Sequence, residues 1–180
     1  MKKLFLIAAI AIMSVAANAQ DKGPKTGFRL GIEAGYTFAT EGKGSWNDVN
    51  IDITAGAQIL PWFYVGGGIG LDIYTDSDLK TVMGGTPLQL PIYGQVKFFL
   101  PTRSVVQPYI DLRGGYAVNL SKSDDGGIVE CGIGAEFFEH WNLSVGYNGR
   151  FYSKSKTVGQ ITQTTSWDTN GVYLRLGYRF

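Results

Sequence analysis

Apolar and polar residues alternate with a period of two along most of this 180-residue chain. A period of two places successive side chains on opposite faces of a β-strand, so the pattern predicts strands rather than helices. Each segment is close to the roughly 9–11 residues that a tilted membrane strand needs. The eight segments are Phe28 to Phe38, Val49 to Leu60, Tyr64 to Tyr74, Leu88 to Leu100, Tyr109 to Asn119, Ile128 to Phe138, Trp141 to Tyr152 and Gly171 to Phe180.

The connections between these segments alternate in length. Those at 61–63 and 139–140 are tight and 101–108 is moderate, whereas longer polar connections span 39–48, 75–87, 120–127 and 153–170. Short turns at one rim and long loops at the other are typical of a barrel in an outer membrane. We therefore predict an all-β fold, an eight-stranded antiparallel up-and-down transmembrane β-barrel over residues 27–180.

The N-terminal segment has the pattern of an export signal. Lys2 and Lys3 precede an apolar run that ends in Ala17-Asn18-Ala19, a cleavage site of the A-x-A type. We predict a signal peptide over 1–19 and a flexible lead-in over 20–26. The formal net charge of +1 gives no basic excess of the kind that nucleic-acid binding requires, so no nucleic-acid partner is expected.

Alternation alone does not say which face points inward, because a soluble ligand-carrying barrel also alternates, with its apolar face inside. Three features favour a polar interior. The polar face is rich in glycine, which a narrow lumen accommodates; aromatic residues gather near both ends of the apolar face, as in membrane girdles; and the chain ends inside a strand.

This orientation directs six acids and six bases into the lumen, the interior of the barrel. Buried charges are costly unless they are paired, so we predict a closed, charge-paired lumen with at most a few trapped waters. The network comprises Arg29, Glu33, Asp52, Asp72, Lys97, Asp111, Arg113, Glu130, Glu136, Arg150, Arg175 and Arg179.

The last seven residues are Leu174-Arg175-Leu176-Gly177-Tyr178-Arg179-Phe180, with apolar residues at every second position before a final aromatic. This ending resembles the C-terminal signal of outer-membrane barrels, and the mature chain is similar to small barrels of the OmpA/OmpX type, in the porin family with an outer membrane protein β-barrel domain. The resemblance implies a bacterial outer-membrane location, contact with outer-membrane lipids, and assembly-machinery recognition through Leu174, Leu176, Tyr178 and Phe180. Because the sequence stops at Phe180, we expect no periplasmic peptidoglycan-binding domain.

Other motifs give weak indications of chemistry. Outer-membrane acyl transferases and deacylases resemble this chain in outline and use a histidine with a serine near the outer rim, but His140 lies in a tight turn that we place at the periplasmic rim. Asp76 with Asp78, and Asp124 with Asp125, supply too few oxygens for calcium, which takes about six or more. We predict no catalytic, cofactor-binding or metal site, and we place Cys131 on the lipid face.

Two further segments carry structural predictions. Pro91 cannot donate to a strand ladder, so we expect a bulge there or a strand that begins near Ile92. The Thr- and Gln-rich segment from Thr157 to Thr169 is equally compatible with a floppy loop and with a hairpin that protrudes beyond the membrane.

Three functions remain open from the sequence. The first is a structural or surface-interaction barrel whose extracellular loops contact a protein or another surface ligand. The second is a narrow, porin-like channel for small solutes or ions. The third, at low weight, is a lipid-modifying enzyme; we expect the protein not to be an enzyme.

Overall fold

The computed structural model describes residues 25–41, 47–75, 88–102, 104–120, 126–158 and 161–180. The predicted signal peptide and most of the lead-in lie outside these residues. None of the described residues forms a helix long and apolar enough to cross a membrane. The strands are β1 (Gly27–Glu41), β2 (Asp48–Leu60), β3 (Phe63–Tyr74), β4 (Leu88–Phe99), β5 (Val106–Asn119), β6 (Gly126–Phe137), β7 (Trp141–Val158) and β8 (Ile161–Arg179).

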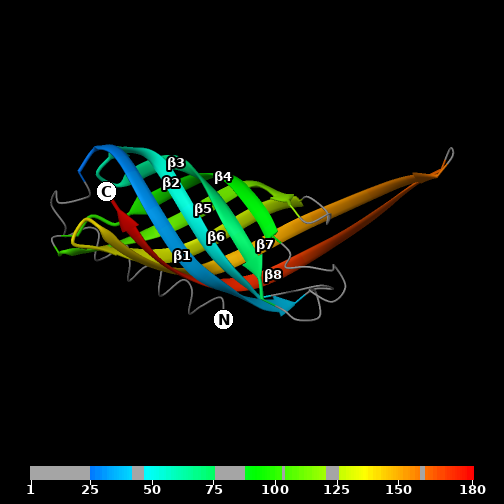
Figure 1. Cartoon of the computed structure of the whole chain (residues 1–180). Helices are drawn as coiled ribbons and strands as arrows, with labels where there is room; N and C mark the ends of the chain where they lie inside the picture. Colours follow the sequence, from blue (N-terminus) through cyan, green and yellow to red (C-terminus); the bar gives the residue numbers. More distant parts are fainter. Residues whose placement is uncertain (1–24, 42–46, 76–87, 103, 121–125, 159–160) are drawn as a thin grey trace, which may run out of the picture.

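The eight strands form one closed barrel in sequence order (Figure 1). Each strand pairs antiparallel with its neighbours, and β1 closes the barrel against β8 from Gly31↔Arg179 onward. The predicted fold class is therefore confirmed. The β2–β3, β4–β5 and β6–β7 connections share one end, which we call the short-turn end; the opposite end is the long-loop end.

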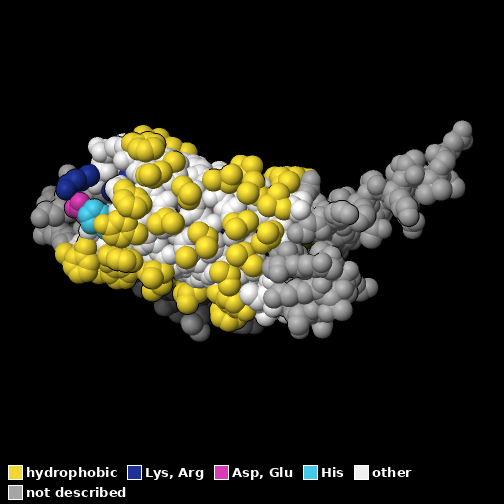
Figure 2. Space-filling view, in the orientation of Figure 1, with side chains coloured by type: hydrophobic (Ala, Val, Ile, Leu, Met, Phe, Trp, Pro, Cys, Tyr) yellow, Lys and Arg dark blue, Asp and Glu magenta, His cyan; other side chains and the backbone are white. Residues whose placement is uncertain are grey.

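The apolar face of every strand points outward. Exposed hydrophobic side chains cover the wall, including Ile53, Ile133 and Leu176, while polar side chains such as Asn50 and Lys97 are buried inside. Figure 2 shows the hydrophobic side chains spread over the outer wall of the barrel. The alternative of a soluble barrel with an apolar interior is therefore wrong, because this surface suits lipid rather than water.

The expectation of a bulge at Pro91, or of a strand that starts near Ile92, is wrong. Strand β4 begins at Leu88 and keeps a single register with β5 through Pro91↔Ala117. Towards β3, the ladder is interrupted around Pro91 and then continues in the same register. Gly70 on β3 leaves room for the proline ring, since a Cβ there would lie 3.1 Å from Pro91 Cγ.

The β7–β8 hairpin extends well beyond the other strands at the long-loop end (Figure 1). The two strands pair continuously up to Val158↔Ile161. The neighbouring ladders stop earlier, at Gly126↔Tyr152 on the β6 side and at Glu41↔Asn170 on the β1 side. Of the two possibilities for this segment, the structure therefore shows the protruding hairpin.

The β6–β7 turn at the short-turn end adopts a strained conformation. Phe138 and Glu139 have positive φ angles of 54° and 65°, and the His140 N–H donates to the Phe137 carbonyl at 3.1 Å. Two successive positive φ angles are typical of a type I′ turn, which usually carries Asn-Gly because other residues resist positive φ. The turn places Glu139 and His140 beside the start of β1, where they line a shallow pocket.

Candidate functional site: the charged interior

Glycines on the inner wall make room for tyrosine rings that lie against it. A Cβ on Gly132 or Gly146 would collide with the Tyr173 hydroxyl. The same relation joins Tyr64 to Gly56 and Gly66, Tyr93 to Gly68, and Tyr109 to Gly134. A narrow barrel needs small residues beside large ones, and this pairing explains why the polar face of the sequence contains so many glycines.

Basic side chains lie over the faces of the aromatic rings. Five of the six lumen bases are within reach of a cation–π contact, in which the electron-rich ring face partly replaces the lost water. The distances to the ring centroid are 4.8 Å for Lys97 over Tyr109, 5.1 Å for Arg113 over Tyr93, 5.6 Å for Arg150 over Tyr74, 4.1 Å for Arg175 over Tyr173 and 5.4 Å for Arg179 over Tyr64.

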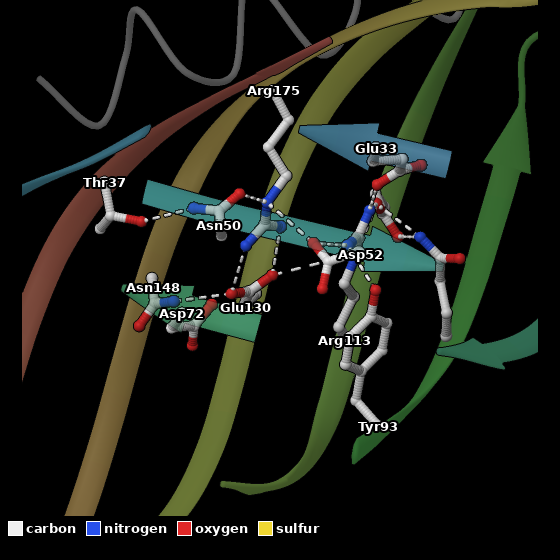
Figure 3. A network of polar contacts seen from close by, with 12 residues as sticks. Glu33, Thr37, Asn50, Asp52, Asp72, Tyr93, Arg113, Glu130, Asn148 and Arg175 are labelled. Atoms are coloured by element: carbon white, nitrogen blue, oxygen red, sulfur yellow. Dashed lines mark hydrogen bonds and ion pairs between the residues drawn. The ribbon is translucent and has the colours of Figure 1, made fainter. Parts of the chain in front are cut away.

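The central cluster joins carboxylates and bases from strands on opposite sides of the lumen (Figure 3). Arg113 on β5 contacts Glu33 on β1, and its Nη2 lies 2.9 Å from Asp111 Oδ2. Lys97 Nζ lies 3.2 Å from the other oxygen of Glu33. Because Lys97 Nζ also lies 3.9 Å from Asp111 Oδ2, both acids of this group have two basic partners, which offsets the cost of burying them.

Arg175 and Glu130 form the second half of the central cluster. Both guanidinium Nη atoms of Arg175 donate to the Glu130 carboxylate, with Nη2 at 2.8 Å from Oε1. The remaining Nε donates to Asn50 Oδ1 at 3.1 Å, and Asn148 donates to Glu130 at 2.6 Å. Two parallel bonds between a guanidinium and a carboxylate are stronger and more specific than a single contact.

Two smaller clusters lie towards the ends of the lumen. In the loop-end cluster, Arg150 Nη2 lies 3.0 Å from Asp72 and 3.4 Å from Asp48, and its Nη1 donates to Gln89. In the turn-end cluster, Arg29 and Arg179 both contact Glu136, with 2.8 Å between Arg29 Nη1 and Oε1. The three clusters place charged groups at each level of the interior.

All twelve residues of the predicted lumen network are directed inward, and each forms an ion pair with an oppositely charged residue. Eleven are buried, and the Arg29 side chain is 11% exposed. The sequence analysis missed Asp48, which it placed in a loop. Because Asp48 begins β2 and is buried against Arg150, the described lumen holds seven acids and six bases.

Sequence reasoning also missed apolar groups in the interior. Phe99 packs against Tyr109 with ring centroids 5.3 Å apart, and Ala117 and Ile128 lie next to Tyr93. These residues sit at strand ends, where alternation is hardest to assign. The residue before Phe99, Phe98, is also aromatic, so composition gives no sign of which one faces the lumen.

Several buried polar atoms have no hydrogen-bond partner among the described residues. They include both amide atoms of Asn142, the Ser144 hydroxyl and the Tyr173 hydroxyl, in addition to one carboxylate oxygen of Asp52. Buried polar groups of this kind usually bind ordered water. The interior can therefore hold individual waters between side chains that are otherwise closely paired.

The remaining candidate residues form no such constellation. His140 lies at the short-turn end, and its Nδ1 donates to the Arg179 carbonyl at 2.9 Å. Cys131 is exposed on the outer face. Within the described part of the chain, no group of three or more acidic, histidine or cysteine side chains is arranged to hold a metal. Asp76, Asp78, Asp124 and Asp125 lie outside the described residues.

An apolar lipid-facing wall, a charged interior and short turns at one end define an integral β-barrel protein of the bacterial outer membrane. The family model for the outer membrane protein beta-barrel domain matches residues 7–180, and the chain belongs to this family.

Several solved structures are similar to this chain at low sequence identity. Neisserial surface protein A is 17% identical, with 88% of this chain and 100% of that chain covered and a TM-score of 0.55. OprG from Pseudomonas aeruginosa is 16% identical over 89% and 99%, with a TM-score of 0.49. The outer membrane enzyme PagL is 12% identical over 81% and 97%, with a TM-score of 0.49. No curated protein sequence matches the chain.

Proposed function

We propose that this barrel is a closed scaffold in the outer membrane and that its extracellular side contacts other macromolecules. The observation that carries the first half is the paired interior, with the central Arg113–Glu33 and Arg175–Glu130 contacts bridging strands on different sides of the lumen. An eight-stranded barrel has an interior just wide enough for its own side chains. Ions crossing it would have to separate these pairs.

The β7–β8 hairpin supports the second half of the proposal. Beyond Tyr152 and Asn170 its two strands pair only with each other within the described residues. Their outer edges therefore present backbone N–H and C=O groups at the long-loop end, which faces the outside of the cell in barrels of this kind. Such edges recruit an extended segment of another protein by strand addition.

Planar-bilayer recording of the purified barrel tests the closed scaffold. We expect no stable single-channel steps, because the lumen is filled at several levels by paired side chains. Large and stable steps would instead favour the alternative of a narrow, porin-like channel. That alternative has one supporting observation, the unpartnered polar atoms of Asn142, Ser144 and Tyr173, which provide places for water.

A shortened hairpin tests the surface interaction. Replacing residues 154–165 with Asn-Gly joins Ser153 to Ser166, which are paired in the structure, through a favourable two-residue turn. Phage-displayed extended peptides would be selected against the wild-type barrel in lipid nanodiscs. We expect the selected peptides to lose binding to the shortened variant; equal binding to both, or no selected peptide, would contradict the proposal.

We also propose that the protein has no lipid-modifying activity. The chain contains one histidine, and the structure places its side chain at the short-turn end, hydrogen-bonded to the backbone of β8. A serine nucleophile that is activated by histidine needs that histidine within hydrogen-bond reach. Lipid analysis of a deletion strain tests this view, and a change in lipid acylation that the restored gene reverses would contradict it.

Finally, we propose that the end of β8 is recognised by the barrel assembly machinery. Leu174, Leu176 and Phe180 are exposed on the outer face, and Tyr178 packs against Phe180 with ring centroids 5.2 Å apart. These four side chains are therefore on the side of the strand that another protein can contact before the barrel inserts.

A further inference from the structure

The barrel wall has a notch at the short-turn end, between β1 and the β6–β7 turn. Strand β1 pairs with β2 from Gly27, but its pairing with β8 begins only at Gly31. The last backbone link between β1 and β8 is the Phe180 N–H, which donates to Leu30 O at 2.8 Å. The first residues of β1 therefore extend past the end of β8, and no other described strand pairs with them on that side.

A pocket of about 170 Å³ occupies this notch. Its lining combines basic, acidic and lipid-facing aromatic side chains, and it includes the strained β6–β7 turn. The lining residues are Lys25, Thr26, Gly27, Phe28, Arg29, Glu139, His140, Arg179 and Phe180.

The Lys25–Glu139 ion pair of the pocket is available to a ligand. Lys25 Nζ lies 3.1 Å from Glu139 Oε2, but their side chains are 82% and 52% exposed. An ion pair this exposed contributes little stability, so exchanging it for contacts with a ligand costs little. Arg29 is held beside the pocket by Glu136, which it shares with Arg179. Two bases therefore share one acid at this rim.

The apolar part of the pocket lies at the edge of the lipid-facing wall. Phe28 and Phe180 are 74% and 71% exposed. His140 and Phe180 both pack on Tyr178, at 5.5 Å and 5.2 Å between ring centroids, as part of the aromatic belt at this boundary. Figure 2 shows the visible charged and histidine side chains gathered at this end of a largely hydrophobic wall.

We propose that the notch binds the headgroup of a phosphatidylethanolamine-type phospholipid from the periplasmic leaflet. Arg29 and Lys25 contact the phosphate, Glu139 accepts from the ammonium group, and the acyl chains run along Phe28 and Phe180. Arginine and lysine suit phosphate oxygens, and basic pockets at a membrane boundary recognise lipid headgroups in this way. A purely anionic ligand would leave the adjacent carboxylate of Glu139 without a role.

Native mass spectrometry of the protein, refolded in a non-ionic detergent, tests the proposal. The added lipids are dioleoyl phosphatidylethanolamine, dioleoyl phosphatidylcholine and dioleoyl glycerol, with inorganic phosphate as a separate competitor. We expect phosphatidylethanolamine to be retained about tenfold more than the glycerol, since a charge-assisted hydrogen bond corresponds to about a tenfold change in affinity. Phosphatidylcholine, whose headgroup ammonium cannot donate a hydrogen bond, should fall between them.

Two variants locate the site. Lys25→Glu lies outside the strands and Arg29→Gln leaves Glu136 paired with Arg179, so both should fold, as heat-modifiable migration in electrophoresis would verify. Each should reduce retained phosphatidylethanolamine about tenfold. Lys154→Glu makes the same charge change at the opposite end and should have no effect.

Three results would overturn the proposal. Equal retention of the glycerol and the phospholipid would show that no headgroup is recognised. Displacement of the lipid by millimolar inorganic phosphate would identify the site as one for a soluble anion. Unchanged retention in both folded variants would place any lipid elsewhere on the barrel. None of these results bears on the role proposed for the β7–β8 hairpin.

Discussion

The lumen residues follow one arrangement at several levels of the barrel: glycine on the wall, tyrosine against the glycine, a base over the ring and a carboxylate beside the base. Around β8 the members are Gly146, Tyr173, Arg175 and Glu130. The tyrosine, the base and the carboxylate exclude water from one another. The ion pair and the cation–π contact together offset the cost of this desolvation. A change in one layer should therefore affect the others.

Removing the base of this set should destabilise the folded barrel strongly. Arg175→Ala leaves the Glu130 carboxylate with Asn148 as its one close partner, apart from Arg113 at 3.9 Å. We expect a loss of about 3–5 kcal/mol in the free energy of unfolding, the range for breaking a buried pair. Urea titration of the barrel refolded in lipid vesicles measures it.

The double variant Arg175→Ala with Glu130→Gln is the matched control for this prediction. It removes the stranded charge and should recover part of the lost stability, because an unpaired neutral amide costs less than an unpaired carboxylate. A loss below about 1 kcal/mol in the single variant would show instead that water reaches the carboxylate freely and screens it.

The glycine layer gives a second residue-scale prediction. A Cβ on Gly146 would lie 2.5 Å from the Tyr173 hydroxyl oxygen, so Gly146→Ala should cost about 1–3 kcal/mol through overpacking. Gly114 faces outward and has no heavy atom within 4 Å of an added Cβ, so Gly114→Ala should change stability by less than about 0.5 kcal/mol. The urea midpoints of the two variants measure the effect on the lumen face and on the outer face. Equal losses of stability would contradict the tyrosine–glycine packing.

At the scale of the element, each strand acts as a partition between lipid and a polar interior. Strand β8 shows this most simply, since Leu174 and Leu176 face outward while Tyr173, Arg175 and Arg179 are buried. Because successive residues alternate, a shift of one position would exchange the two faces completely. This constraint also explains why β4 continues in register through Pro91 and loses part of its ladder with β3 instead.

The two faces should respond differently to an added positive charge. Leu174→Arg places a guanidinium in lipid and should cost about 2–4 kcal/mol near the membrane midplane. Thr54 is buried in the lumen, where Thr54→Arg meets polar neighbours and should destabilise mainly by crowding. Refolding yields and urea titrations in vesicles compare the two variants. A harmless Leu174→Arg together with failed insertion of Thr54→Arg would contradict the assigned orientation.

The whole molecule joins a closed barrel to one projecting hairpin. Away from the notch at the short-turn end, closure leaves no free strand edge around the barrel wall, so the strands satisfy one another's backbone groups within the lipid. The free edges are displaced to the part of β7 and β8 beyond the other strands, where water and other proteins are available. The two ends therefore differ chemically, with strand edges at the long-loop end and a charged, aromatic rim at the short-turn end.

Assembly of the whole molecule should depend on its last residue. Phe180 is 71% exposed, so its deletion removes little internal packing and one backbone hydrogen bond, to Leu30, and should lower the stability of a barrel refolded in detergent by only about 1 kcal/mol. In cells, we expect the truncated chain to accumulate in the periplasm or to be degraded, because the proposed recognition of β8 is lost. Membrane fractionation measures this, with Phe138→Ala as a control for an exposed phenylalanine in a turn. Normal outer-membrane levels of the truncated chain would contradict the proposal that the end of β8 is an assembly signal.

The sequence by itself determined the strands and the division of their faces. A period of two is a local property of the chain, and every ladder in the barrel follows from it. The glycine-rich polar face and the outward aromatics also indicated which side meets lipid. Strand ends were assigned less well: Asp48 continues the alternation of β2 but was placed in a loop, and Phe99 and Ile128 lie inside the barrel although they are apolar.

Only the tertiary structure decided which groups meet across the lumen. Glu33 contacts Arg113, 80 residues away, and Arg175 contacts Asn50, 125 residues away. The extension of β7 and β8, and the notch where β8 stops short of the start of β1, also depend on how the ladders end against one another. These contacts arise from the stagger and tilt with which eight strands close, a property of the complete sheet that no single segment contains.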